Sequence, residues 1–148
     1  MAAGAQALRS RIASERRLPA QASELAAARE YARGAAAAFG LDDDRCYEFA
    51  FAVNEAVTNA IRHGRPDEHG DIHLSVFADD DRLTFSVRDC GTFAASTFDR
   101  VTSSERGRGF ALMTRLMDAV QLCAAPGSTT LRLSKLACES QLAAELGG

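Results

Sequence analysis

The longest apolar pattern in the chain predicts one packed helix from Asp43 to His63. This run contains neither glycine nor proline, and its apolar side chains recur at steps of three and four residues, the spacing of one helix face. Gly64 is expected to end the helix in the left-handed conformation, and Pro66 prevents the helix from resuming. The apolar positions are Cys46, Phe49, Ala50, Val53, Val57 and Ala60.

An alanine-rich helix is predicted before it, from Gln21 to Phe39. Ser23 is expected to cap its start, and Gly40 to end it. A short edge strand from Glu15 to Pro19 precedes this helix. The positions in helical phase are Leu25, Ala28, Ala32, Ala35 and Phe39.

Strict alternation of apolar and polar residues predicts a β-hairpin in the middle of the chain. Its first strand runs from Asp71 to Ala78, and its second ends at Arg88-Asp89. The acidic run Asp79 to Asp81 forms the turn. The apolar positions are Ile72, Leu74 and Val76 in the first strand, and Leu83, Phe85 and Val87 in the second.

The last third of the chain predicts a helix followed by another hairpin. The stretch from Thr92 to Ser104 has no period and is rich in serine and threonine, so we expect it to be mobile. Gly107 to Gly109 is expected to open the helix, whose face is formed by Phe110, Met113, Leu116, Met117 and Val120. Strands follow from Val120 to Ala124 and from Thr129 to Leu136, joined by a turn at Pro126 to Ser128.

This order, strand-helix-helix-hairpin-loop-helix-hairpin, predicts an α/β (α+β) protein. We expect a two-layer sandwich with a mostly antiparallel sheet and helices on one face. The predicted organisation is a flexible N-terminus (1–14), one domain (15–136) and a C-terminal tail (137–148).

The amino-acid composition is most simply interpreted as that of a single water-soluble domain. The 148 residues are 47% hydrophobic and 25% charged, with a net charge of −3. That charge disfavours nucleic acid as a direct partner, and no apolar run has the length of a membrane span. A cytoplasmic protein with reduced thiols is expected, because the cysteines are scattered and no secretory signal is apparent. The cysteines are Cys46, Cys90, Cys123 and Cys138.

Candidate chemistry begins with Glu55 and Asn59 on the central helix. They are one turn apart and therefore share a face. A carboxylate can deprotonate or orient a nucleophile, and an amide oxygen suits Mg²⁺. Taken alone, such a pair usually just forms a solvated helix face.

Two further motifs follow in order, each with a use for a nucleotide. Asp89-x-Gly91 ends a strand, where a carboxylate can accept a hydrogen bond from the exocyclic amine of adenine. Gly107-x-Gly109 starts a helix, where glycines let backbone N–H groups approach phosphates, assisted by the helix dipole. Each motif is common by chance, but the three in this order point to a nucleotide site.

With these motifs the chain resembles the histidine-kinase-like ATP-binding superfamily, which includes gyrase, heat-shock chaperones, histidine kinases and MutL. Within that superfamily it resembles the anti-sigma factor serine/threonine kinases of the RsbW and SpoIIAB type. The matching residues are Glu55 to Ala60 with His63-Gly64, Arg88-Asp89-x-Gly91, Gly107-x-Gly109-Phe110 with Leu116-Met117-Asp118-x-Val120, and Gly127 to Thr130. The resemblance covers about residues 15–136.

The resemblance implies the Bergerat fold, an ATP and Mg²⁺ site, and transfer of phosphate to a serine or threonine of an anti-sigma antagonist. Glu55 would be the general base, Asn59 would hold Mg²⁺, and Arg106 would stabilise charge at the γ-phosphate. The remaining nucleotide-binding residues would be Asp89, Gly91, Gly107, Gly109 and Thr130. A sigma factor, the antagonist and a second copy of the chain are the implied partners.

Two departures from the group's pattern favour an alternative, a catalytically weak or inactive nucleotide-gated module that acts by binding proteins. Phe93 stands where the second motif usually has another glycine. The stretch between Gly91 and Gly107 is also short for a lid over ATP. A fragment of a two-component histidine kinase is disfavoured, because no dimerisation helix with a phospho-accepting histidine precedes the domain.

Overall fold

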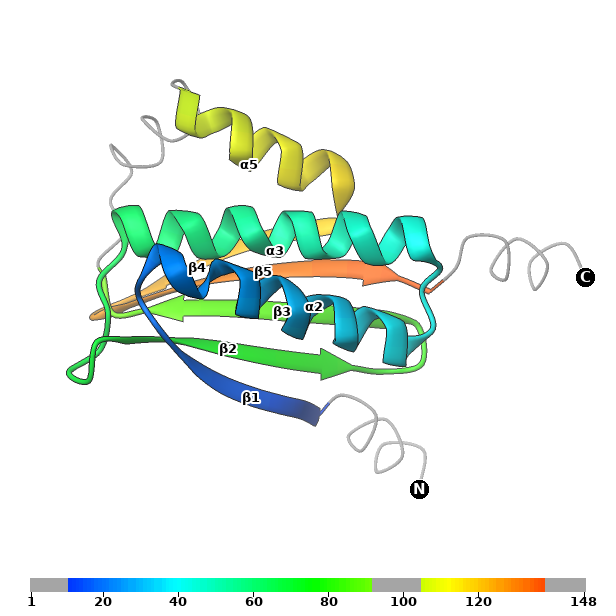
Figure 1. Ribbon diagram of the computed structural model, residues 1–148, viewed down its shortest axis with the longest axis horizontal. Helices are drawn as coiled ribbons and strands as arrows, with labels where there is room; N and C mark the ends of the chain where they lie inside the picture. The colour runs from blue at the N-terminus through cyan, green and yellow to red at the C-terminus, as the bar shows by residue number, and fades with distance from the viewer. Residues whose placement is uncertain (1–10, 92–104, 138–148) are drawn as a thin grey trace, which may run out of the picture.

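The computed structural model describes residues 11–91 and 105–137 of the chain. These residues form one antiparallel sheet with helices on one of its faces (Figure 1). The predicted two-layer architecture and element order are thus confirmed. The elements are β1 (Arg11–Pro19), a 3-10 helix η1 (Ala22–Glu24), α2 (Leu25–Phe39), α3 (Asp43–His63), β2 (Asp71–Ala78), β3 (Arg82–Asp89), α5 (Glu105–Leu116), β4 (Ala119–Ala125) and β5 (Ser128–Leu136).

The strands are arranged in the order β1-β2-β3-β5-β4, and every neighbouring pair is antiparallel. The hairpin β2-β3 therefore meets the hairpin β4-β5 through β3 and β5. In this register Asp89 pairs with Thr129. The end of β3 and the start of β5 consequently lie side by side at one edge of the molecule, close to the end of α3 (Figure 1).

The core lies between α3 and the middle of the sheet. The predicted stripe of α3 is buried, with Phe49, Val53 and Val57 fully enclosed. Phe49 meets Phe85 of β3 edge to face, with ring centroids 6.1 Å apart. Such an aromatic contact adds to the hydrophobic gain from burying both rings. It also ties the first third of α3 to the middle of β3.

Helix α2 packs through small side chains. Ala28, Ala32 and Ala36 are completely buried at four-residue spacing. Alanine at these positions lets the helix backbone come close to its neighbours, and it is also the best helix former. Gly40 adopts φ 107° and ends α2 in the left-handed conformation, as expected.

Several predicted boundaries are corrected by the structure. β1 begins at Arg11, so residues 11–14 belong to the sheet rather than to a frayed terminus. Ser23 does not cap α2, because it lies inside η1 and α2 begins only at Leu25. Val120 lies in β4 because α5 ends at Leu116. Within the described residues, no helix is long and apolar enough to span a membrane.

Candidate functional site

The carboxylate of Asp89 is the most enclosed of the predicted site groups that the structure describes. Asp89 is the last residue of β3, and only 8% of it is exposed. Its Oδ1 accepts hydrogen bonds from the N–H of Gly91 at 2.7 Å and of Arg65 at 3.3 Å. Burial raises the pKa of the Asp89 carboxyl, and these two amide donors oppose the rise.

Gly64 explains how this carboxylate fits beneath the end of α3. Its backbone is extended, with φ −88° and ψ −166°, so the predicted left-handed ending is wrong. A Cβ on Gly64 would lie 2.5 Å from both Cγ and Oδ2 of Asp89, and 2.6 Å from the carbonyl oxygen of Ala60. Glycine is therefore required here by the close approach of the carboxylate and not by backbone conformation.

Gly91 leaves room on the other side of the same carboxylate. A Cβ there would lie 2.8 Å from Asp89 Oδ1 and 3.2 Å from the backbone nitrogen of Arg65. Two further hydrogen bonds hold this corner. Cys90 N–H donates to the carbonyl oxygen of Arg65 at 2.7 Å, and the hydroxyl of Thr129 donates to the carbonyl oxygen of Gly91 at 2.9 Å.

Thr129, which the sequence analysis did not name as a site residue, is therefore the threonine of β5 that contacts Gly91. In β5 the side chains of Thr129, Leu131 and Leu133 are buried beneath the helices. Because successive strand residues point to opposite faces, Thr130 belongs to the open face. The buried leucines at 131 and 133 were the sequence signal that could have assigned Thr129 to the helix side.

Glu55 and Asn59 lie on the half of α3 that is nearer its C-terminus, and both are partly buried. Gly109 of α5 packs directly on Glu55, since a Cβ on Gly109 would lie 2.5 Å from Oε2 of Glu55. Gly109 consequently permits close packing of α5 on α3. From Glu55 to Gly64 the helix rises by roughly 13 Å, so Glu55 and the Asp89 carboxylate beneath Gly64 lie at different levels along α3.

The beginning of α5 holds the other predicted phosphate residues. The helix starts at Glu105, so Arg106, Gly107 and Gly109 all lie in its first two turns and the glycines do not open it. The side chain of Arg106 lies outside what the structure describes, as do Phe93 and the expected lid residues 92–104. Among the described residues there is no cluster of three or more histidine, cysteine or acidic side chains that could hold a metal.

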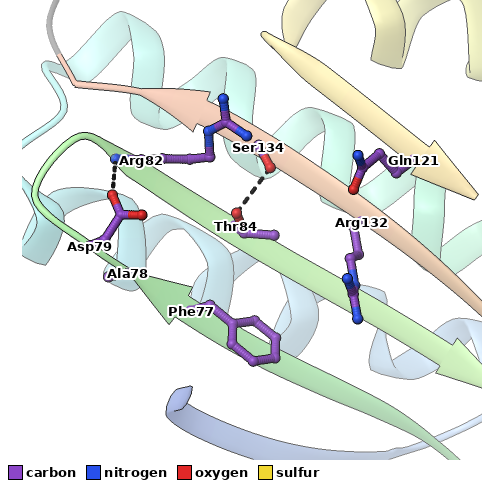
Figure 2. A pocket seen from close by; sticks show the side chains of 8 residues that line it. All are labelled: Phe77, Ala78, Asp79, Arg82, Thr84, Gln121, Arg132 and Ser134. Carbon is purple, nitrogen blue, oxygen red and sulfur yellow. Dashed lines mark hydrogen bonds between the residues drawn. The ribbon is translucent and has the colours of Figure 1, made fainter. Parts of the chain in front are cut away.

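The open face of the sheet, opposite the helices, is hollowed at two places. Figure 2 shows the smaller hollow, of about 240 Å³, around Phe77, Thr84 and Arg132. A larger one, of about 660 Å³, contains Thr130 and Arg88. The structure therefore separates Thr130 from Asp89 and Gly91 by the thickness of the sheet.

Comparison with known proteins bears on the family of the chain. The profile of the histidine kinase-like ATPase domain matches residues 18–135. The anti-sigma F factor of Bacillus subtilis (strain 168) is 34% identical over 102 residues, covering 62% of this chain and 70% of that protein. The serine-protein kinase RsbW of the same organism is 31% identical over 123 residues, covering 73% of this chain and 76% of that protein.

A solved structure shares the fold. It contains the RsbU and RsbW domains of a Mycobacterium tuberculosis protein and matches with a TM-score of 0.62 at 23% identity. The match covers 83% of this chain and only 32% of that longer one. The chain belongs to the histidine kinase-like ATPase domain family, and within it to the anti-sigma factor serine/threonine kinases of the RsbW and SpoIIAB type.

The close approach at Gly64 predicts a clear cost for a single methyl group. Gly64→Ala should lower the free energy of unfolding by about 1–3 kcal/mol, because the backbone carbonyl of Ala60 cannot move aside cheaply. Gly34→Ala is the matched control. Nothing lies within 4 Å of a Cβ on Gly34 in α2, so that change should stabilise by about 0.5–1 kcal/mol. Urea denaturation measures both, and a harmless Gly64→Ala would contradict the packing described.

Burial of Asp89 predicts a pH-dependent stability difference. Because its pKa is raised on folding, the folded protein holds this proton more tightly than the unfolded chain. Stability contributed by Asp89 therefore falls as pH rises from about 4 towards 7. Asparagine cannot ionise, so the midpoint of thermal unfolding of Asp89→Asn, relative to wild type, should increase across this range. Parallel pH profiles for the two proteins would argue against the shift.

Proposed function

We propose that this protein binds ATP with Mg²⁺ between the C-terminal half of α3 and the start of α5, and transfers phosphate to a serine or threonine of an anti-sigma antagonist. The observation that carries the proposal is the buried Asp89 carboxylate framed by Gly64 and Gly91, where neither glycine has space for a Cβ. Such an arrangement costs stability unless a ligand uses it. The family match supports the nucleotide.

In this proposal Asp89 recognises the adenine amine. Two backbone N–H groups already bond to its Oδ1, which orients the carboxylate. Oδ2, on the side of Gly64, is then the oxygen that accepts from an exocyclic amine. The two glycines leave backbone instead of side chains beside the base. A charge-assisted bond in an enclosed site is strong enough to select adenine over guanine.

At the other end of the region, Asn59 and the first turns of α5 would face the phosphates. When bound, ATP supplies the phosphoryl group and Mg²⁺ neutralises charge on it. The Asn59 amide oxygen suits Mg²⁺, with phosphate oxygens and water completing its shell. Gly107 lies in the first turn of α5, where backbone N–H groups have no acceptor inside the helix and the helix dipole is positive, while Gly109 lets α5 approach Glu55 closely. Arg106 is proposed to offset negative charge there.

Glu55 is proposed as the general base, which accepts the proton of the incoming serine or threonine hydroxyl. It lies one turn from Asn59 on the same face of α3, so base and metal ligand are held by one rigid element. The contact of Gly109 with Oε2 limits where the carboxylate can point. That restriction suits a group which has to meet a hydroxyl in one direction.

The proposed partners come from the names of the relatives. Proteins called anti-sigma F factor and serine-protein kinase RsbW support a sigma factor as the captured partner and an antagonist as the phosphorylated one. A homodimer, which the resemblance implies, and a cytoplasmic location, which the scattered cysteines favour, complete the proposal. Phe93, in place of the usual glycine, favours the alternative of a nucleotide-gated binding module with weak or no transfer.

The adenine assignment predicts a loss of base selectivity in Asp89→Asn. Selectivity for ATP over GTP should shrink by roughly 1.5–3 kcal/mol, the net contribution of a hydrogen bond to a charged group. Calorimetric titration with each nucleotide measures it. Asp81→Asn, in the exposed turn between β2 and β3, is the control and should change nothing. Unaltered selectivity in Asp89→Asn would show that another group reads the base.

The two residues of α3 are expected to fail in different ways. Glu55→Gln keeps the shape and removes the base, so ATP binding should stay within about threefold while transfer falls by roughly 10²–10⁴. Asn59→Ala should impair both, because it removes a metal ligand. Paired calorimetry and phosphate transfer to the cognate antagonist separate the two effects.

Three results of that experiment would change the proposal. Wild-type protein that binds ATP tightly but transfers no phosphate would leave the nucleotide-gated module. Full transfer in Glu55→Gln would keep the kinase and reject this base. Wild-type protein that binds no nucleotide would reject both functions.

A further inference from the structure

Lys135 is a buried cation at the junction of the sheet and two helices. Only 5% of its side chain is exposed, and lysine is rarely so enclosed unless it is paired. It follows Leu133 on the helix side of β5, so the side chain reaches up between α3 and α5. Its Nζ forms an ion pair with Glu48 of α3 and donates a hydrogen bond of 2.6 Å to the carbonyl oxygen of Leu116.

The bond to Leu116 fastens the end of α5. Leu116 is the last residue of that helix, so no N–H group of the helix donates a hydrogen bond to its carbonyl oxygen. The ammonium group also meets the negative end of the helix dipole. Asp118, two residues after the end of α5, connects the chain to β5 a second time. Its carboxylate accepts a hydrogen bond from the N–H of Leu136 at 2.7 Å, and its own N–H donates to the carbonyl oxygen of Ser134 at 3.0 Å.

The two ends of α5 are matched to two carboxylates of α3. Glu48 and Glu55 are seven residues apart, as are Leu116 and Gly109. Seven residues make about two turns, or roughly 10 Å of helix. The helices run in opposite directions, so Glu48 lies near Leu116 while Glu55 lies against Gly109 (Figure 1). Fixing one end of α5 therefore sets its register at the other end.

We propose that Lys135 is a positioning residue for the nucleotide site, acting through α5. By holding Glu48 and the Leu116 carbonyl together, it keeps Gly109 in contact with Glu55 and keeps the first turns of α5 in place. This inference rests on the proposed function, because it assigns the start of α5 to the phosphates. Lys135 itself lies about two helical turns from that end and touches no nucleotide.

The test replaces Lys135 with methionine, which fills similar space without charge. Two quantities are measured well below the unfolding midpoint: amide hydrogen exchange in residues 110–116 without ligand, and the dissociation constant for Mg·ATP. Lys135→Met should speed exchange by about tenfold, as expected when a charge-assisted bond is lost. It should also weaken ATP binding by about fivefold or more, the lower end of couplings between sites.

Two controls separate positioning from general loss of stability. Leu74 is buried in β2, away from α5. Of the variants Leu74→Val and Leu74→Ala, the one that lowers the unfolding midpoint as much as Lys135→Met is the matched control. It should leave both quantities within about twofold. Glu48→Gln removes the counter-ion of the buried ammonium but keeps the bond from Lys135 to Leu116, so it should raise exchange in residues 110–116 and weaken ATP binding, each by a smaller factor than expected for Lys135→Met. If the methionine variant does not fold, unchanged exchange in Glu48→Gln would overturn the anchor.

Unchanged exchange in Lys135→Met, or an equal rise in the Leu74 control, would overturn the anchor. Faster exchange in α5 with unchanged ATP affinity would overturn the positioning role. Wild-type protein that fails to bind ATP would overturn the proposed function instead, and the exchange measurement would then decide the anchor by itself.

Discussion

The packing of α3 along the sheet is the constraint on which the rest of the structure depends. The 21 residues of α3 rise about 30 Å, close to the length of the strands beneath it. Phe49, in the first third of α3, packs on Phe85 in the middle of β3. Because α3 and β3 end on the same side of the molecule, this one contact brings Gly64 over Asp89 (Figure 1).

The spacing of apolar residues correctly predicted the helices and strands that bury a single continuous apolar face. The bounds of α3 and β2 agree with the sequence to the residue, because their apolar spacing is uninterrupted and their ends carry glycine, proline or acidic turns. Fold class followed from their order. The same signal is weak in α2, where alanine is compatible with either burial or exposure and the start of the helix was placed too early.

Site geometry was harder to predict, since it depends on contacts between distant segments. Gly64 looked like a left-handed helix end, whereas the structure shows that a carboxylate 25 residues later leaves no room for a side chain. Motif matching named Thr130 as a site residue and did not consider Thr129 for that role, although strand alternation assigns the inner position to Thr129. In both cases the prediction used a local sequence pattern, whereas the contact depends on how two distant segments of the chain are aligned.

Glu48 and Glu55 show why residue type does not define a role. They stand on the same side of α3, two turns apart, and both are partly exposed. The carboxylate of Glu48 forms an ion pair with the buried ammonium group of Lys135. Glu55 meets the backbone of Gly109. Lys135 thus holds Glu48 in a structural contact, and Glu55 is the carboxylate that we propose for proton transfer. Asp89 completes the contrast, because burial raises its pKa and only backbone amides oppose this. A hydrogen-bond donor brought to this carboxylate by a ligand would therefore favour its charged form.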